Sequence, residues 1–202
     1  SFDAHELRLA HGMLRSAIMQ RSAEAGHQHA HHLLAAEVWA QQPGPGTAER
    51  RGRHLLAAGQ LHEAVQAFFE ALQENTSSHD PRQSIELLAT TRAAMDRAGV
   101  PLSDERHAEI VYREASDARQ YAGLRVAQQL AEAALKREPR FHDRDLARFH
   151  LLLGVIAATE DSATRLDSWR QEVDRALEIG GQFPIISGIA DLHLSTIAAM
   201  SG

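Results

Sequence analysis

The sequence predicts an all-α protein, and three observations support this prediction. Apolar residues recur at helical spacing along almost all of the 202 residues, whereas the alternation typical of strands is nearly absent. Only 5% of the residues are aromatic and alanine is frequent, so the core must consist of small and aliphatic side chains, which suits packing between helices. Proline and glycine separate the periodic segments by short connections. Such connections make consecutive helices antiparallel.

Residues 1–42 are expected to form an N-terminal helical cap or a linker to an upstream domain. A few alternating residues near Leu7 and Leu9 are compatible with a short strand before the first helix. The segment ends at Pro43-Gly44-Pro45-Gly46, whose prolines and glycines cannot continue a helix. The helices expected in this part are residues 12–20 and 24–41.

Residues 47–202 are expected to form a single α-solenoid. Thr47 offers a hydroxyl that can cap the first helix of this part. Gly59-Gln60, Gly99-Val100-Pro101 and Gly180-Gly181 are expected to separate later helices. The expected helices are residues 47–58, 61–74, 82–98, 103–120, 123–137, 144–159, 163–179 and 185–200.

Composition and charge argue against several classes of function. The net charge of −6 disfavours a surface that holds many phosphates or an anionic membrane. The basic residues near Arg140 alternate with acids, as on an ordinary solvated surface. Zero cysteines exclude disulfides and a thiol nucleophile, and no apolar run approaches the ~18 residues of a membrane span. We therefore expect a cytoplasmic protein that binds neither nucleic acid nor membrane through this segment.

The sequence contains no catalytic motif that we recognise. Neither GxxxxGK[ST] nor GxGxxG nor GxSxG occurs, so phosphate-binding loops and a nucleophile elbow are missing. The histidines at 27, 29, 31 and 32 form the one cluster that suggests chemistry, because His27 and His31 lie four residues apart and could face one metal ion. Nothing near them completes a ligand set. We expect no enzymatic activity, no metal and no cofactor.

Two segments of the chain repeat one pattern of small and apolar residues. The pattern of residues 52–72 recurs over residues 115–135, which are followed by Pro139, and a looser third copy includes Leu153-Gly154 and Ala176-Leu177. Small residues at fixed offsets are expected where paired helices touch, so Gly52 and Ala127 are predicted to lie at close contacts. The first copy comprises Gly52, Leu55, Gly59, Leu61, Ala64, Phe68, Ala71 and Leu72, and the second Ala115, Ala118, Ala122, Leu124, Ala127, Ala131, Ala134 and Leu135.

This pattern resembles the tetratricopeptide repeat, a 34-residue helix-turn-helix unit with W-x2-L-G-x2-Y followed by A-x3-F, A and P. The chain departs from it, since neither first helix begins with Trp and the first copy has Thr76 where Pro is usual. The resemblance implies a right-handed superhelix of antiparallel hairpins with irregular repeats, whose first helices line a peptide-binding groove. The groove residues it implies are Glu49, Arg53, Glu109, Tyr112, Arg113, Ser116, Arg119 and Arg148.

Residues 7–39 carry a second resemblance. Their sequence LRLAHGMLRSAIMQRSAEAGHQHAHHLLAAEVW is similar to the segment that joins a winged-helix module to the repeat array in signal-transduction ATPases with numerous domains. This implies that the chain is the C-terminal sensor region of a larger bacterial regulator, either such an ATPase or one linked to a kinase or helix-turn-helix output domain, and that it acts in transcription regulation. The matching residues are Leu9, His11, Leu14, Arg15, Ala17, His32, Ala35 and Ala36.

The expected function is non-enzymatic recognition of a protein or peptide. Two alternatives belong to other classes. A structural scaffold would self-associate through an apolar patch, for which the last predicted helix, residues 185–200, is the candidate. A small-molecule sensor would have an apolar pocket between helices, lined by residues such as Phe141, Phe149 and Trp169.

Overall fold

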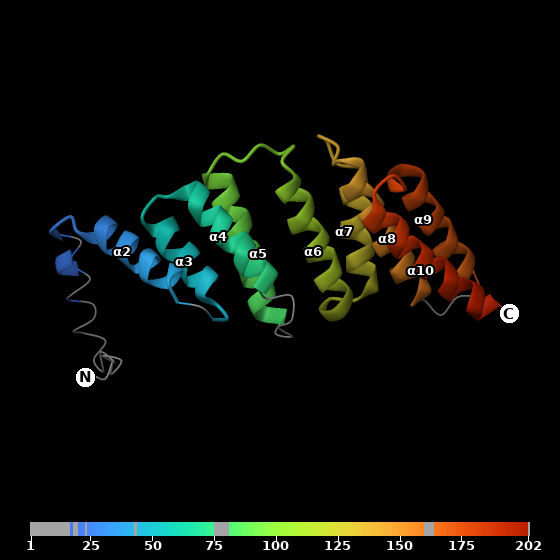
Figure 1. Ribbon diagram of the computed structural model, residues 1–202, viewed down its shortest axis with the longest axis horizontal. Coiled ribbons are helices and arrows are strands. Elements are labelled where there is room, and N and C mark those ends of the chain that lie inside the picture. Colours follow the sequence, from blue (N-terminus) through green and yellow to red (C-terminus); the bar gives the residue numbers. More distant parts are fainter. Residues whose placement is uncertain are drawn as a thin grey trace. The chain divides into compact units, whose positions relative to one another are not determined.

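The computed structural model describes residues 17, 20–22, 24–42, 44–74, 81–159 and 164–201 (Figure 1). Every regular element among these residues is an α-helix, so the all-α prediction is confirmed for the described part of the chain. The expected strand near Leu7 and Leu9, with most of the expected helix 12–20, lies outside the described residues. The helices divide between two compact units, Ser1–Ser78 and His79–Gly202, each of which is described by itself.

The first unit contains α2 (Gln28–Ala40), α3 (Thr47–Ala57) and α4 (Leu61–Glu74), with α3 packed against both of the others. The expected cap and the first expected hairpin are therefore in contact within one unit. Gly59, at a left-handed φ of 72°, forms the turn between α3 and α4. Helix α4 carries a set of buried side chains, and one of them, Phe68, lies against Gly52 of α3.

Two details of the first unit differ from the prediction. The helix expected over 24–41 begins only at Gln28, because Gly26 adopts a left-handed φ of 70° and breaks the chain into a turn. Thr47 does not cap α3: Gly46 occupies the N-cap position, and the Thr47 hydroxyl donates to the Gly44 carbonyl at 2.8 Å. The hydroxyl thus closes the preceding loop instead of the helix end.

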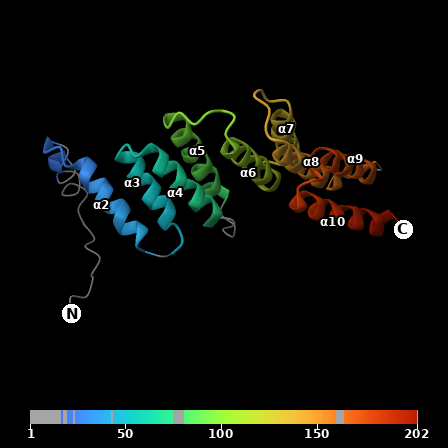
Figure 2. The same ribbon diagram turned by 45° about the horizontal axis from the view of Figure 1, so that its top comes forward.

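The described residues of the second unit form six helices: α5 (Pro81–Arg97), α6 (Glu105–Tyr121), α7 (Leu124–Leu135), α8 (Asp143–Ala158), α9 (Arg165–Gly180) and α10 (Pro184–Ser201). Each helix packs against the next one in the chain, and α8 also contacts both α6 and α10 (Figures 1 and 2). The bounds agree with the predicted ones to within a few residues, because proline, glycine and the Asp104 side chain define the ends.

The core of the second unit consists of two apolar clusters joined by α8. One lies among α6, α7 and α8 and is built on fully buried Ala115, Ala127 and Ala131. The other lies among α8, α9 and α10 and is built around Trp169 and Val173. Helix α8 contributes side chains to both clusters and contacts both α6 and α10. This arrangement positions the candidate site.

Small residues occupy the closest helix contacts, as the repeat pattern predicts. A Cβ placed on Gly52 would lie 2.9 Å from the Phe68 ring, and a Cβ on Gly154 would lie 2.9 Å from Cδ1 of Trp169. Ala127 is completely buried between α7 and its neighbours. In both helix pairs, α3–α4 and α8–α9, a glycine therefore leaves room for a bulky ring of the partner helix.

Candidate functional site

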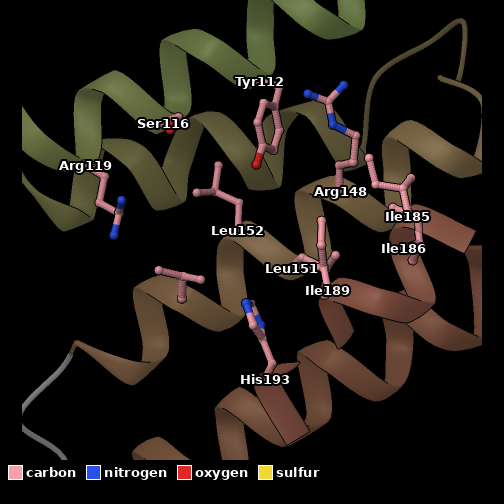
Figure 3. Close-up of a pocket in the computed structure, with 11 residues that line it drawn as sticks. Tyr112, Ser116, Arg119, Arg148, Leu151, Leu152, Ile185, Ile186, Ile189 and His193 are labelled. Carbon is pink, nitrogen blue, oxygen red and sulfur yellow. The ribbon is translucent and has the colours of Figure 1, made fainter. Parts of the chain in front are cut away.

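A cavity of about 190 Å³ lies between α6, α8 and α10 in the second unit (Figure 3). Each helix contributes one stripe of side chains at spacings of three or four residues, which places them on one helical face. The stripes come together because α6 and α10 both contact α8. The lining comprises Tyr112, Ser116 and Arg119 from α6, Arg148, Leu151, Leu152 and Val155 from α8, and Ile185, Ile186, Ile189 and His193 from α10.

The walls formed by α8 and α10 are mainly apolar. Leu151 and Leu152 are 5% exposed and Ile186 is completely buried, so they form a fixed surface. Ile185 and Ile189, by contrast, are 65% and 38% exposed. The hydrophobic lining therefore continues from the cavity onto the open surface of α10, where a partner could cover it.

Arg148 is held in place by partners on two helices. Its Nη1 donates to Oε2 of Glu109 at 2.8 Å and lies 3.6 Å from Oδ1 of Asp145, a buried carboxylate. Its guanidinium carbon stands 4.1 Å from the centre of the Tyr112 ring, the geometry of a cation–π contact. The charge of Arg148 is thus already compensated, and its side chain braces α6 against α8.

Glu109 joins this network to Arg113 beside the cavity. The Nε of Arg113 donates to Oε1 of Glu109 at 2.6 Å. Burial alone would raise the pKa of Glu109, but the charge of Arg148 and the hydrogen bonds from both arginines outweigh it and lower the pKa below its usual value. Glu109 is therefore ionised at neutral pH. It accepts hydrogen bonds from Arg113 and Arg148 and is not part of the cavity lining.

Arg119 is in a different position from Arg148. It has neither a hydrogen bond nor an ion pair with the residues that the structure describes, and its Nε is a buried donor without an acceptor. Figure 3 shows its guanidinium directed toward the space between α6 and α10. A guanidinium carries five N–H donors, so Arg119 is a cation whose hydrogen-bonding capacity is not used within the described chain.

His193 presents a neutral ring to the same cavity. Nε1 of Trp169 lies 3.3 Å from Nδ1 of His193. Because an indole N–H can only donate, Nδ1 of His193 is the acceptor of this hydrogen bond. Burial lowers the pKa of His193 below its usual value. The proton of the neutral ring therefore sits on Nε2, which makes His193 a hydrogen-bond donor on its free side.

The structure brings together half of the predicted groove residues. Tyr112, Ser116, Arg119 and Arg148 line the cavity, whereas Glu109 and Arg113 form the ionic network next to it. The two remaining residues belong to the first unit, where Arg53 donates to Glu49 at 2.6 Å along α3. The α10 residues Ile189 and His193 are not among the predicted groove residues. The apolar sequence of α10 predicts a self-association patch instead.

The aromatic residues expected to line a small-molecule pocket lie elsewhere. Phe149 is completely buried and stacks on Phe141 with 5.9 Å between ring centres, and Trp169 fills the space above Gly154. None of the three rings lines the cavity between α6, α8 and α10. These rings instead fill volume that the alanine-rich helices leave between them.

The histidines at and near the start of α2 contact other side chains in pairs. The rings of His27 and His31 are 5.9 Å apart, and Nδ1 of His31 lies 2.8 Å from the Ser22 hydroxyl. His32 and His54 meet through their Nδ1 atoms at 2.9 Å. Within the described ranges, no group of three or more His, Asp or Glu side chains is arranged to hold a metal ion. Over the same residues, every helix is too short or too polar to cross a bilayer.

A larger hollow of about 490 Å³ lies between α7, α8 and α9. Polar side chains in its wall bond to each other: Nδ1 of His150 and Oε2 of Glu172 are 2.7 Å apart, and Gln128 donates to Glu132 at 2.9 Å. We place the candidate site between α6, α8 and α10, where the charged group Arg119 has no such partner among the described residues.

Comparison of the chain with protein-family models, with curated proteins and with solved structures finds no match.

Proposed function

We propose that this chain is a non-enzymatic interaction module that binds a segment of another protein, or a peptide, along α6, α8 and α10. The observation that carries the proposal is the cavity itself, in which apolar side chains of α8 and α10 face the uncompensated Arg119 of α6. Apolar area supplies affinity and a charged donor supplies orientation, a combination typical of interaction hot spots.

The size of the cavity favours a polypeptide over a small molecule. Pockets that hold drug-sized ligands have volumes of ~300–1,000 Å³. The cavity of about 190 Å³ is smaller and suits an anchoring side chain. The rest of a polypeptide would lie on the exposed side chains of α10, where Ile185 and Leu192 are 65% and 66% exposed.

The wider setting of the module is also part of the proposal. The sequential packing of α6 to α10 and the small residues at their contacts support a right-handed superhelix of tetratricopeptide-like hairpins. Following the two resemblances, we place the module in the sensor region of a larger bacterial regulator of transcription in the cytoplasm. Binding in the groove would then report the presence of the partner to the rest of that regulator.

Selection from a random-peptide library on the immobilised full chain tests the proposal. Peptides that bind should lose at least about tenfold in affinity when Ile189, in the cavity wall, is changed to Glu, because the charge would lie in apolar surroundings. Val126 on α7 is equally exposed, 40% against 38% for Ile189, and lies outside the cavity lining, so Val126→Glu is the matched control. Selected peptides that bind Ile189→Glu as tightly as the parent would contradict a site in this groove.

Self-association through α10 is the second candidate function. Ile185, Leu192 and Met200 are 65%, 66% and 48% exposed, which is unusual for three apolar residues of one helix. Sedimentation of the full chain over a range of concentrations tests this reading. A concentration-dependent dimer that Leu192→Glu abolishes and Val126→Glu retains would favour the scaffold, and a monomer throughout would exclude it.

A further inference from the structure

The cavity between α6, α8 and α10 carries uncompensated positive charge. The described side chains that line it include the two arginines Arg119 and Arg148 and no carboxylate. Glu109 and Asp145, which stand outside the lining, neutralise Arg148 at 2.8 Å and 3.6 Å. Arg119 has no counterpart of this kind among the described residues. The charge of Arg119 therefore remains available to a ligand.

The polar groups with fixed roles in this cavity are donors. A guanidinium cannot accept a hydrogen bond, and Nδ1 of His193 is occupied by the Trp169 indole, which leaves the Nε2 proton of His193 on its other side. Figure 3 shows the His193 ring and the Arg119 guanidinium directed toward the same space from α10 and α6. Tyr112 and Ser116 carry hydroxyls that can donate or accept. The complementary group on a ligand is accordingly an acceptor, and a negative one.

The remaining lining determines what must accompany that acceptor. Leu152 is 5% exposed, and Ile185 and Ile189 form the opposite edge on α10. Branched aliphatic side chains pack well on such a surface and are stabilised when they are buried there. An acidic group alone would leave this area exposed to water, and an aliphatic group alone would leave Arg119 unpaired.

We propose that the bound segment presents a carboxylate to Arg119 and, next to it, a branched aliphatic side chain to Ile189 and Leu152. In a polypeptide this corresponds to Asp or Glu close to Leu, Ile or Val. The inference rests on the proposed function, since it names the chemistry of the partner at the same site. Charge complementarity with Arg119 is what selects this occupant over a purely apolar helix.

A pair of small probes tests the inference on the full chain. Isocaproate combines a carboxylate with a branched aliphatic tail, and isocaproamide has the same shape without the charge. In an NMR titration of isotope-labelled protein near neutral pH, isocaproate should shift the signals of Arg119 and of the α10 amides and bind about tenfold more tightly than isocaproamide, because hydrogen bonds to charged groups are the stronger ones.

The variants assign that preference to one residue. In Arg119→Gln the two probes should bind within about twofold of each other, since the remaining contacts are apolar. Arg125→Gln removes an exposed arginine of α7 that is not part of the lining and should keep the preference. Circular dichroism and the melting temperature of each variant establish that it is folded.

The other outcomes overturn the inference. Equal binding of both probes to the parent protein would mean that Arg119 does not select an anion. If the preference for the carboxylate persists in Arg119→Gln, a group other than Arg119 binds the carboxylate. If no NMR signal of the α10 amides shifts, both probes bind elsewhere. None of these results contradicts the proposed function, which fails only if peptides selected on the full chain are insensitive to Ile189→Glu.

Discussion

Gly52 of α3 lies directly against the ring of Phe68 of α4, so closely that a Cβ on Gly52 would come within 2.9 Å of two ring carbons. Phe68 is completely buried and cannot move aside without displacing its neighbours. The contact shows why a glycine stands inside a helix, where glycine costs ~1 kcal/mol relative to alanine. The lost helix propensity is offset by the closer approach of the two helices.

Gly52→Ala should therefore destabilise the protein. Overpacking against the Phe68 ring costs about 1–3 kcal/mol, which exceeds the gain in helix propensity of ~1 kcal/mol. Gly188 of α10 is the matched control, because it is exposed and a Cβ there would meet nothing within 4 Å. Gly188→Ala should stabilise by about 0.5–1 kcal/mol. Urea unfolding of the two variants measures both changes, and equal effects would refute the proposed contact.

Ala127→Leu should also be destabilising, by about 1–3 kcal/mol, because Ala127 is completely buried in the core between α6, α7 and α8. Ala133 lies on the same helix α7 but is exposed. Ala133→Leu should change the free energy of unfolding by no more than about 0.5 kcal/mol. An unchanged denaturation midpoint for Ala127→Leu would mean that α7 does not pack through this face.

Glu109→Gln should weaken the network that joins α6 to α8. Glu109 accepts hydrogen bonds from Arg113 and Arg148 and its side chain is 27% exposed, so the loss should be about 1–2 kcal/mol at neutral pH. The matched control is Glu49→Gln on α3, since the exposed pair of Glu49 with Arg53 should contribute at most about 0.5 kcal/mol. Chemical denaturation compares them, and similar losses would show that the Glu109 network contributes no more than a surface pair.

The same network predicts a pH dependence. Because the pKa of Glu109 is lower in the folded protein than in the unfolded chain, its contribution is complete above the usual glutamate pKa and is lost as the pH falls through the folded value. Between neutral and acidic pH, the parent protein should lose more stability than Glu109→Gln does. Parallel stability curves for the two proteins would contradict the lowered pKa.

His193 predicts a loss of stability in a higher pH range. Burial lowers its pKa from 6.5, so the neutral ring that accepts from Trp169 is favoured, and protonation would set two donors against each other. The stability it contributes is complete above that unfolded value and declines as the pH falls below it. His193→Gln keeps an acceptor for the indole and does not titrate. Melting temperatures measured across this range should fall more steeply for the parent than for His193→Gln, and equal slopes would refute the assignment.

The helices and the small residues at their contacts can be predicted from the sequence. Both depend on local information: proline and glycine end helices through their own backbone preferences, and apolar spacing marks the buried face of each helix. Thus α4 agrees with its predicted bounds, and Gly52 and Ala127 lie at close contacts as expected. The prediction failed where local alternatives compete, since the Thr47 hydroxyl bonds the preceding loop and not the end of α3.

Which polar groups share a site, and which of them already have hydrogen-bond partners, depends on how the helices pack together. Arg119 and Arg148 look alike in the sequence, but Arg148 reaches Glu109 on another helix at 2.8 Å, whereas Arg119 has no partner among the described residues. His193 joins Tyr112 only because α6 and α10 both pack on α8. Such contacts join residues far apart in the chain, and they depend on how each helix is rotated and placed against its neighbours. Helical periodicity contains no information about that placement.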